Sequence, residues 1–131
     1  MTGADLLTHL HRGGGAAYLW ALWPDKRKES FWFPAGKQLP AIPAAWQDAN
    51  IFYGVHPAAA MGGKHERSKI ETVSAINCLF AEFDAKDFDG GKDAILSHID
   101  ALWNDGNGLP YPSVIVDSGG GFHCYWLLTS T

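Results

Sequence analysis

The chain has 131 residues, of which 47% are apolar and 13% aromatic, and this supplies enough side chain for the core of a single globular unit. Its formal net charge of −4 gives no overall basic surface of the kind that stand-alone DNA-binding domains often carry. We find no signal peptide and no apolar run as long as a membrane span, so the sequence indicates a cytoplasmic protein without membrane contact. The two cysteines, Cys78 and Cys124, form no CxxC motif, which argues against a disulfide framework or a zinc cluster.

Turn residues and aromatic, strand-like runs predict a small unit of helices and strands in the first half of the chain. Its expected elements are a helix over residues 3–11, strands over 16–23 and around 31–33 joined by a charged turn, a short helix from Pro43 to Ala49, and a strand over 51–55. The two strands beside the charged turn predict a hairpin. All six tryptophans, four of them in this half, are expected to pack in the core.

A small, glycine-containing and basic segment over residues 58–67 predicts a mobile loop. Its Lys64 and Arg67 are candidates for contact with nucleic acid, and the alternative is an ordinary solvated loop. Ser68 and Glu71 follow with the S-x-x-E spacing of a capping box, which predicts the start of a short helix.

The second half of the chain predicts a strand, a helix and a closing hairpin. The expected elements are a strand over residues 77–84, a polar turn over 87–91, a helix with Ile95, Ile99, Leu102 and Trp103 on one face, a return loop over 105–112, and hairpin strands over 113–117 and 122–128. The apolar face of the helix is expected to cover the sheet. Together these elements predict an α+β fold with a mostly antiparallel sheet and covering helices.

Two carboxylates, Glu82 and Asp84, end the strand predicted over residues 77–84. Because side chains alternate along a strand, both project from the same face, with Cα atoms about 6.6 Å apart. Oxygen ligands at this spacing suit one or two hard divalent cations. The alternative is a solvated pair at a strand terminus, which the apolar neighbours Phe80 and Phe83 make less favourable.

A glycine run separates the two strands of the closing hairpin and leads directly into His123. Gly119, Gly120 and Gly121 let backbone N–H groups approach an anion without obstruction, and Ser118 offers a hydroxyl donor. The run has no G-K-[ST] sequence and no following helix, so it matches neither a Walker motif nor a dinucleotide fingerprint. A phosphate-binding turn and an ordinary hairpin loop are the two interpretations.

With these two segments taken together, the sequence resembles the archaeo-eukaryotic primase superfamily, specifically the primase-polymerases and RepB-like replication proteins of plasmids, phages and mobile elements. The family's acidic D/E-x-D/E motif at the end of an apolar strand is matched by Glu82-Phe83-Asp84. Its S-G-x-G-x-H-x-Y-W type of motif is matched by residues 118–126. The resemblance implies that Glu82 and Asp84 bind catalytic Mg²⁺ or Mn²⁺ and that His123 contacts the phosphates of the incoming nucleotide.

The resemblance also implies an RRM-like catalytic core, begun by residues 68–131 after an N-terminal αβ unit over residues 1–57. Nucleoside triphosphates, a single-stranded DNA template and a helicase, in the same chain or separate, are the implied partners. The chain departs from the family in having Gly121 where a serine is common. It also reaches Thr131 before the acidic residue of the family's third motif, so we expect a partial domain with an incomplete RRM-like core.

Two other functions remain open from the sequence. A rolling-circle replication nuclease would need paired histidines and a tyrosine nucleophile on a helix, whereas Tyr125 follows the single His123 inside a predicted strand. A domain that binds nucleotide or nucleic acid without catalysis is the non-enzymatic alternative.

Overall fold

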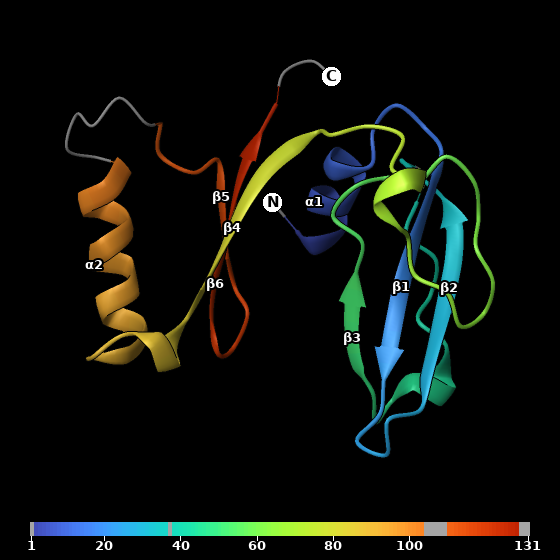
Figure 1. The fold of residues 1–131 in the computed structure, drawn as a ribbon, viewed down its shortest axis with the longest axis horizontal. Helices are drawn as coiled ribbons and strands as arrows, with labels where there is room; N and C mark the ends of the chain where they lie inside the picture. The colour runs from blue at the N-terminus through green and yellow to red at the C-terminus, as the bar shows by residue number, and fades with distance from the viewer. Residues whose placement is uncertain (1, 37, 104–109, 129–131) are drawn as a thin grey trace. The chain divides into compact units, whose positions relative to one another are not determined.

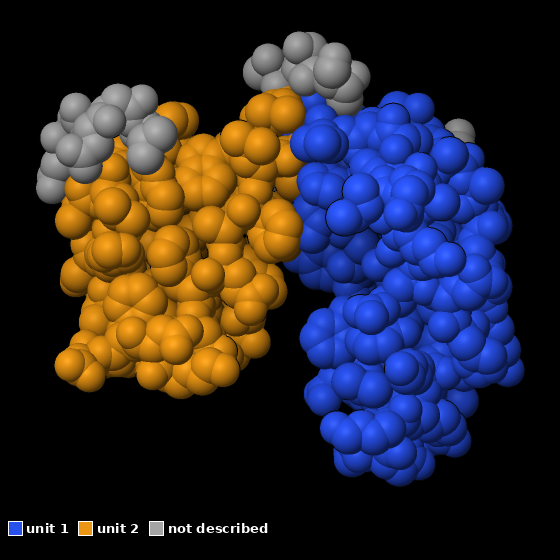
Figure 2. All heavy atoms as spheres, viewed as in Figure 1, with its two compact units in different colours: residues 1–77, 129–131 blue, residues 78–128 orange. Residues whose placement is uncertain are grey.

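The computed structural model describes residues 2–36, 38–103 and 110–128 (Figure 1). The chain divides into two compact units, unit 1 with residues 1–77 and unit 2 with residues 78–128 (Figure 2). Each unit contains its own three-stranded antiparallel sheet. The architecture is therefore α+β with antiparallel sheets, as predicted.

Unit 1 contains one helix, three strands and two single 3₁₀ turns. These elements are α1 (Gly3–Leu10), β1 (Ala16–Leu22), β2 (Lys28–Pro34), η1 (Ala44–Trp46), β3 (Asn50–Tyr53) and η2 (Ile70–Thr72). The strands lie in the order β2-β1-β3, and the β1–β2 hairpin confirms the prediction. The helix expected from Pro43 to Ala49 shortens to the 3₁₀ turn η1.

The core of unit 1 lies on one face of its sheet. Alternate residues of β1, Ala17, Leu19 and Ala21, are buried there together with Phe33 and the fully buried Trp46. Trp23 joins this core, whereas Trp20 and Trp32 are only half buried and belong to the opposite face by strand alternation. The prediction that all six tryptophans are core residues is thus wrong for these two.

Residues 58–67 form no helix or strand, but hydrogen bonds from β2 hold them beside this strand. The backbone N–H of Ser30 donates to the Lys64 carbonyl, and the Ser30 hydroxyl donates to the Glu66 carbonyl at 2.6 Å. Trp32 Nε1–H donates to the same Glu66 carbonyl at 3.2 Å. The segment expected to be a mobile loop therefore has a defined course beside β2.

The helix expected after Ser68 is the single 3₁₀ turn η2. Its N-cap is Lys69, whose backbone N–H donates to Thr72 Oγ1 at 3.0 Å. The Ser68 hydroxyl lies 3.2 Å from the same Thr72 oxygen. The predicted Ser68–Glu71 capping box is wrong, because the N-cap is Lys69, one residue later, and Thr72 rather than Glu71 accepts the N–H of the cap residue.

The C-terminal end of α1 is held by buried polar side chains. Asn77 Nδ2 donates to the carbonyls of Leu10 and Arg12 at 2.8 and 2.9 Å. His11, 1% exposed, lies with Nε2 at 2.6 Å from the Gly54 carbonyl, so Nε2 carries a proton that it donates. Burial lowers the pKa of His11 below its ordinary 6.5, outweighing the Gly54 carbonyl, which raises it. His11 is therefore neutral when unit 1 is folded at neutral pH.

Unit 2 contains three strands, a long helix and a 3₁₀ turn. These elements are β4 (Cys78–Asp84), η3 (Ala85–Asp87), α2 (Gly91–Trp103), β5 (Val114–Asp117) and β6 (Gly121–Leu127). The strand order is β4-β6-β5, with β6 antiparallel to both neighbours. The predicted strand, helix and closing hairpin are confirmed, while residues 105–109 of the expected return loop lie outside the described residues.

One face of the unit 2 sheet packs against α2 (Figure 1). Ile95 and Ile99 are fully buried against Phe122 and Cys124, as the apolar stripe predicted. Cys78 and Cys124 are free thiols, and burial raises the pKa of Cys78 to about 11, which keeps it protonated at neutral pH. Across the described residues, no helix has the length and apolarity to cross a membrane.

Acidification is expected to destabilise unit 1 through His11. Because the folded pKa lies below 6.5, the unfolded chain takes up the proton more readily as the pH falls. The free energy of unfolding should be insensitive to this group above the ordinary pKa and decrease below it, by up to about 1.4 kcal/mol per pH unit. Urea unfolding at several pH values measures the effect.

His11→Gln keeps an N–H donor for the Gly54 carbonyl but cannot titrate, so its stability should depend less on pH. The exposed His98 of α2 provides the matched control, His98→Gln, which should retain the dependence of the unmodified protein. His56, whose pKa burial also lowers, contributes to the remaining slope, and at lower pH so do Asp5 and Asp117, whose pKa values are lowered by hydrogen bonds from Thr2 and Lys92. An unaltered pH dependence in His11→Gln contradicts the assignment.

Candidate functional site

The register of β4 and β6 brings the acidic motif and the histidine together. Glu82 is the cross-strand partner of His123, and Asp84 is the partner of Gly121. Cross-strand partners share a face, so Glu82, Asp84 and His123 all project from the face opposite α2. His123 Nε2 lies 3.7 Å from Glu82 Oε2, and the two side chains are 28% and 62% exposed. Residues predicted from two separate motifs thus lie on one accessible face of the sheet.

Asp84 ends β4 and caps the turn that follows. Its Oδ1 accepts the backbone N–H of Lys86 at 3.1 Å, and Lys86 Nζ lies 3.8 Å from Oδ2. The two side chains are 41% and 77% exposed, so the ion pair contributes little to stability. A divalent cation can therefore displace Lys86 from the Asp84 carboxylate with little loss of stability.

The backbone requires glycine at two of the three positions of the turn. Gly119 has a φ of +91°, in the left-handed region that favours glycine. A Cβ at Gly120 would meet nothing within 4 Å. A Cβ at Gly121 would lie 1.9 Å from the Phe83 carbonyl oxygen, so only glycine allows β6 to approach β4 this closely.

Asp117 and Lys92 support the glycine turn, and sequence reasoning missed both. Asp117 Oδ1 accepts the Gly119 N–H at 2.8 Å and the Lys92 ammonium at 2.6 Å. Lys92, and to a lesser degree Gly119, hold the pKa of Asp117 below its usual range. The Asp117-x-Gly119 spacing is an Asx-turn signal that could have been found, whereas Lys92 comes from the start of α2 and has no such signal.

These contacts limit which groups of the turn can bind an anion. The Gly119 N–H is held by Asp117, and the Ser118 N–H donates to the Gly121 carbonyl at 3.0 Å. The Gly120 carbonyl accepts the Ala85 N–H at 2.8 Å. The Ser118 hydroxyl and the Gly120 N–H have no hydrogen-bond partner among the described residues, so these two donors are the ones available to a phosphate.

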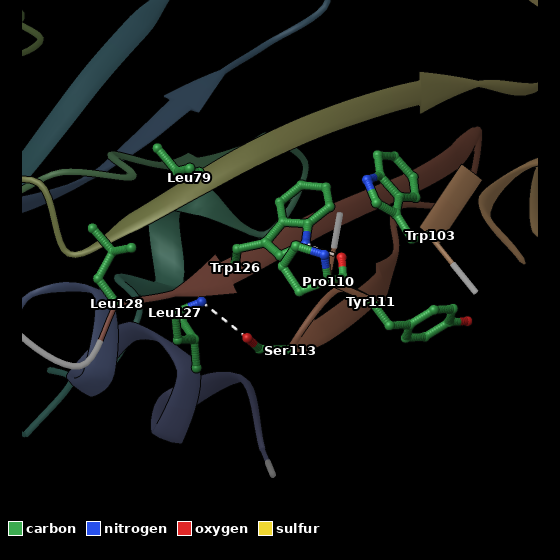
Figure 3. A pocket seen from close by; sticks show the side chains of 8 residues that line it. All are labelled: Leu79, Trp103, Pro110, Tyr111, Ser113, Trp126, Leu127 and Leu128. Atoms are coloured by element: carbon green, nitrogen blue, oxygen red, sulfur yellow. Dashed lines mark hydrogen bonds between the residues drawn. The ribbon is translucent and has the colours of Figure 1, made fainter. Parts of the chain in front are cut away.

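A separate apolar pocket of about 460 Å³ also lies in unit 2 (Figure 3). Trp103 and Trp126 meet edge to face in its wall, with ring centroids 5.0 Å apart. Two hydrogen bonds join polar groups of its lining residues: Trp126 Nε1–H donates to the Pro110 carbonyl, and the Leu127 N–H donates to Ser113 Oγ. None of the predicted site residues lines it.

The remaining predicted residues, Lys64 and Arg67, are exposed on the segment beside β2 in unit 1. Lys64 Nζ lies 3.9 Å from Glu29 Oε1, and the Arg67 guanidinium lies over the Trp20 ring. Within the described part of the chain, no group of three or more His, Cys, Asp or Glu residues is placed to hold a metal ion. Comparison with protein-family models, curated proteins and solved structures found no match to this chain.

Gly121→Ala is expected to destabilise unit 2 by about 3 kcal/mol, at the upper end of the cost of overpacking, because the new methyl group would overlap the Phe83 carbonyl. Urea denaturation of the purified variant measures this loss.

Gly120→Ala is the matched control, since its Cβ enters open space one residue away. Its stability should stay close to that of the unmodified protein. Equal destabilisation by the two substitutions would show that the Gly121–Phe83 approach does not determine the pairing of β4 with β6.

Proposed function

We propose that this chain carries the nucleotide- and divalent-metal-binding part of a DNA primase-polymerase of the archaeo-eukaryotic primase type, which acts in the cytoplasm during replication of a plasmid, phage or other mobile element. The observation that carries the proposal is the pairing of Glu82 with His123 and of Asp84 with Gly121. The acidic motif and the glycine-histidine motif, which together prompted the resemblance, meet on one accessible face of one sheet.

The topology of unit 2 supports an RRM-like core. β4, α2 and β5 follow one another in the chain, and β6 lies between the two strands, antiparallel to both. This is a split βαβ arrangement, which corresponds to the first four elements of the ferredoxin-like pattern β-α-β-β-α-β. α2 covers one face of the sheet, which leaves the Glu82 face for chemistry.

The donor set fits Mg²⁺ or Mn²⁺. These ions commonly use one or two protein carboxylates and complete their coordination with water and substrate phosphate oxygens, and Glu82 and Asp84 are two exposed carboxylates on one face. When bound, the ions would act as Lewis acids on the triphosphate. Among the chain's own groups, His123, the Ser118 hydroxyl and the Gly120 N–H would donate to phosphate oxygens. A single-stranded DNA template and a helicase are the proposed macromolecular partners.

Titration of the chain with a nucleoside triphosphate in the presence of Mn²⁺ tests the proposal. His123→Ala should weaken binding about tenfold to hundredfold, the value of a hydrogen bond to a charged group. Asp84→Asn should abolish the dependence on Mn²⁺ while keeping a side-chain oxygen for the Lys86 N–H, so that the turn stays capped. Mn²⁺-dependent incorporation of nucleotides on a single-stranded template is the catalytic measurement.

The matched controls are Asp87→Asn and His98→Ala, which remove an exposed carboxylate and an exposed imidazole elsewhere in unit 2. Both should bind the nucleotide as the unmodified protein does. Metal-dependent binding that survives both site substitutions would refute the proposal. Binding without incorporation would favour the non-catalytic alternative over the polymerase.

A further inference from the structure

The sheet of unit 1 presents aromatic rings on the face opposite its core, here called the aromatic face. Tyr18 and Trp20 from β1, Trp32 from β2 and Phe52 from β3 lie on it by strand register. The Tyr18 and Trp32 ring centroids are 4.8 Å apart, and those of Trp20 and Phe52 are 5.6 Å apart. Phe52 is 48% exposed, so one broad ring at the β3 edge is open to a ligand.

A basic side chain, that of Arg67, borders the aromatic face. The Arg67 guanidinium lies 4.3 Å from the centroid of the Trp20 ring. The hydrogen bonds of Ser30 and Trp32 to the Glu66 carbonyl hold the neighbouring backbone in place. Figure 1 shows this segment, after β3, passing beside β2. Residues 58–67 therefore place the Arg67 guanidinium beside the Trp20–Phe52 ring pair.

Charge is divided between the two units. Residues 1–77 contain eight Lys and Arg against six Asp and Glu, whereas residues 78–128 contain two against eight. The net charge of −4 thus combines a positive first unit with a strongly negative second one. A polyanion is attracted to unit 1 and repelled by unit 2.

We propose that the aromatic face binds single-stranded nucleic acid, with a base stacked on Phe52 and a phosphate paired with the exposed Arg67. Stacking on protein rings together with cationic contacts to the backbone is how proteins bind single strands without sequence preference. Because the bases of a duplex are stacked on one another, they cannot stack on an aromatic ring of the sheet face. The inference rests on the proposed function only for identifying the bound strand as a template.

The test is fluorescence anisotropy of a labelled oligothymidylate with the full chain, in the absence of nucleotide and divalent metal. Phe52→Ala should weaken binding at least about fivefold, the lower bound for losing one stacked base. Phe52→Tyr, which keeps an aromatic ring, should bind as the unmodified protein does. Arg67→Ala should weaken binding and reduce the slope of log K against log salt concentration by about 0.7.

The matched control is Leu96→Ala, which removes an apolar side chain of similar exposure, 40%, from α2 in unit 2. It should leave the affinity unchanged. Equal affinities for Phe52→Ala, Leu96→Ala and the unmodified protein, or equal affinity for single-stranded and duplex DNA, would overturn the proposal. Asp84→Asn separates the two sites. If the aromatic face binds the strand, this variant should bind oligothymidylate as the unmodified protein does, even if neither protein shows Mn²⁺-dependent nucleotide binding.

Discussion

The candidate site of unit 2 depends on the close approach of the Gly121 backbone to the Phe83 carbonyl, where any side chain would overlap the oxygen. This approach belongs to the register that sets Glu82 opposite His123. Because side chains alternate, a slip by one residue would turn His123 toward α2 and expose Phe122, which is 8% exposed in the core. Exposing that ring would cost about 2 to 3 kcal/mol, so the packing of α2 and the placement of the site reinforce each other.

The division of charge explains how an acidic chain can present surfaces for both cations and anions. Unit 2 gathers carboxylates at the end of β4, and Lys92, one of only two basic residues in this unit, is paired with Asp117 beneath the glycine turn. Unit 1 carries the basic excess, with Arg67 held over an aromatic ring. The net charge of the whole chain predicted no basic surface, because it averages two units of opposite sign.

Local patterns were sufficient to predict most of the elements, because apolar and aromatic runs identify β1, β4 and β6 and the 3.6-residue stripe identifies α2. The shared face of Glu82 and Asp84 also follows from alternation alone. The pairing of Glu82 with His123 could not be predicted, since it depends on register between strands distant in the sequence. The course of residues 58–67 could not be predicted either. Ser30 and Trp32 donate to backbone carbonyls of this segment, and a backbone carbonyl is present at every residue whatever the sequence. The half-buried Trp20 was predictable in principle, since it alternates with the buried Leu19 and Ala21.

Paramagnetic broadening of backbone amide signals by Mn²⁺, with a nucleoside triphosphate present, tests the central claim most directly, because the effect falls steeply with distance from the ion. If the two motifs form one metal and nucleotide site, the broadened signals will be those of residues 82–84 and 119–123, on two strands far apart in the sequence. Broadening centred on the exposed turn carboxylates Asp87 and Asp89, or uniform weak broadening throughout the chain, would contradict the account.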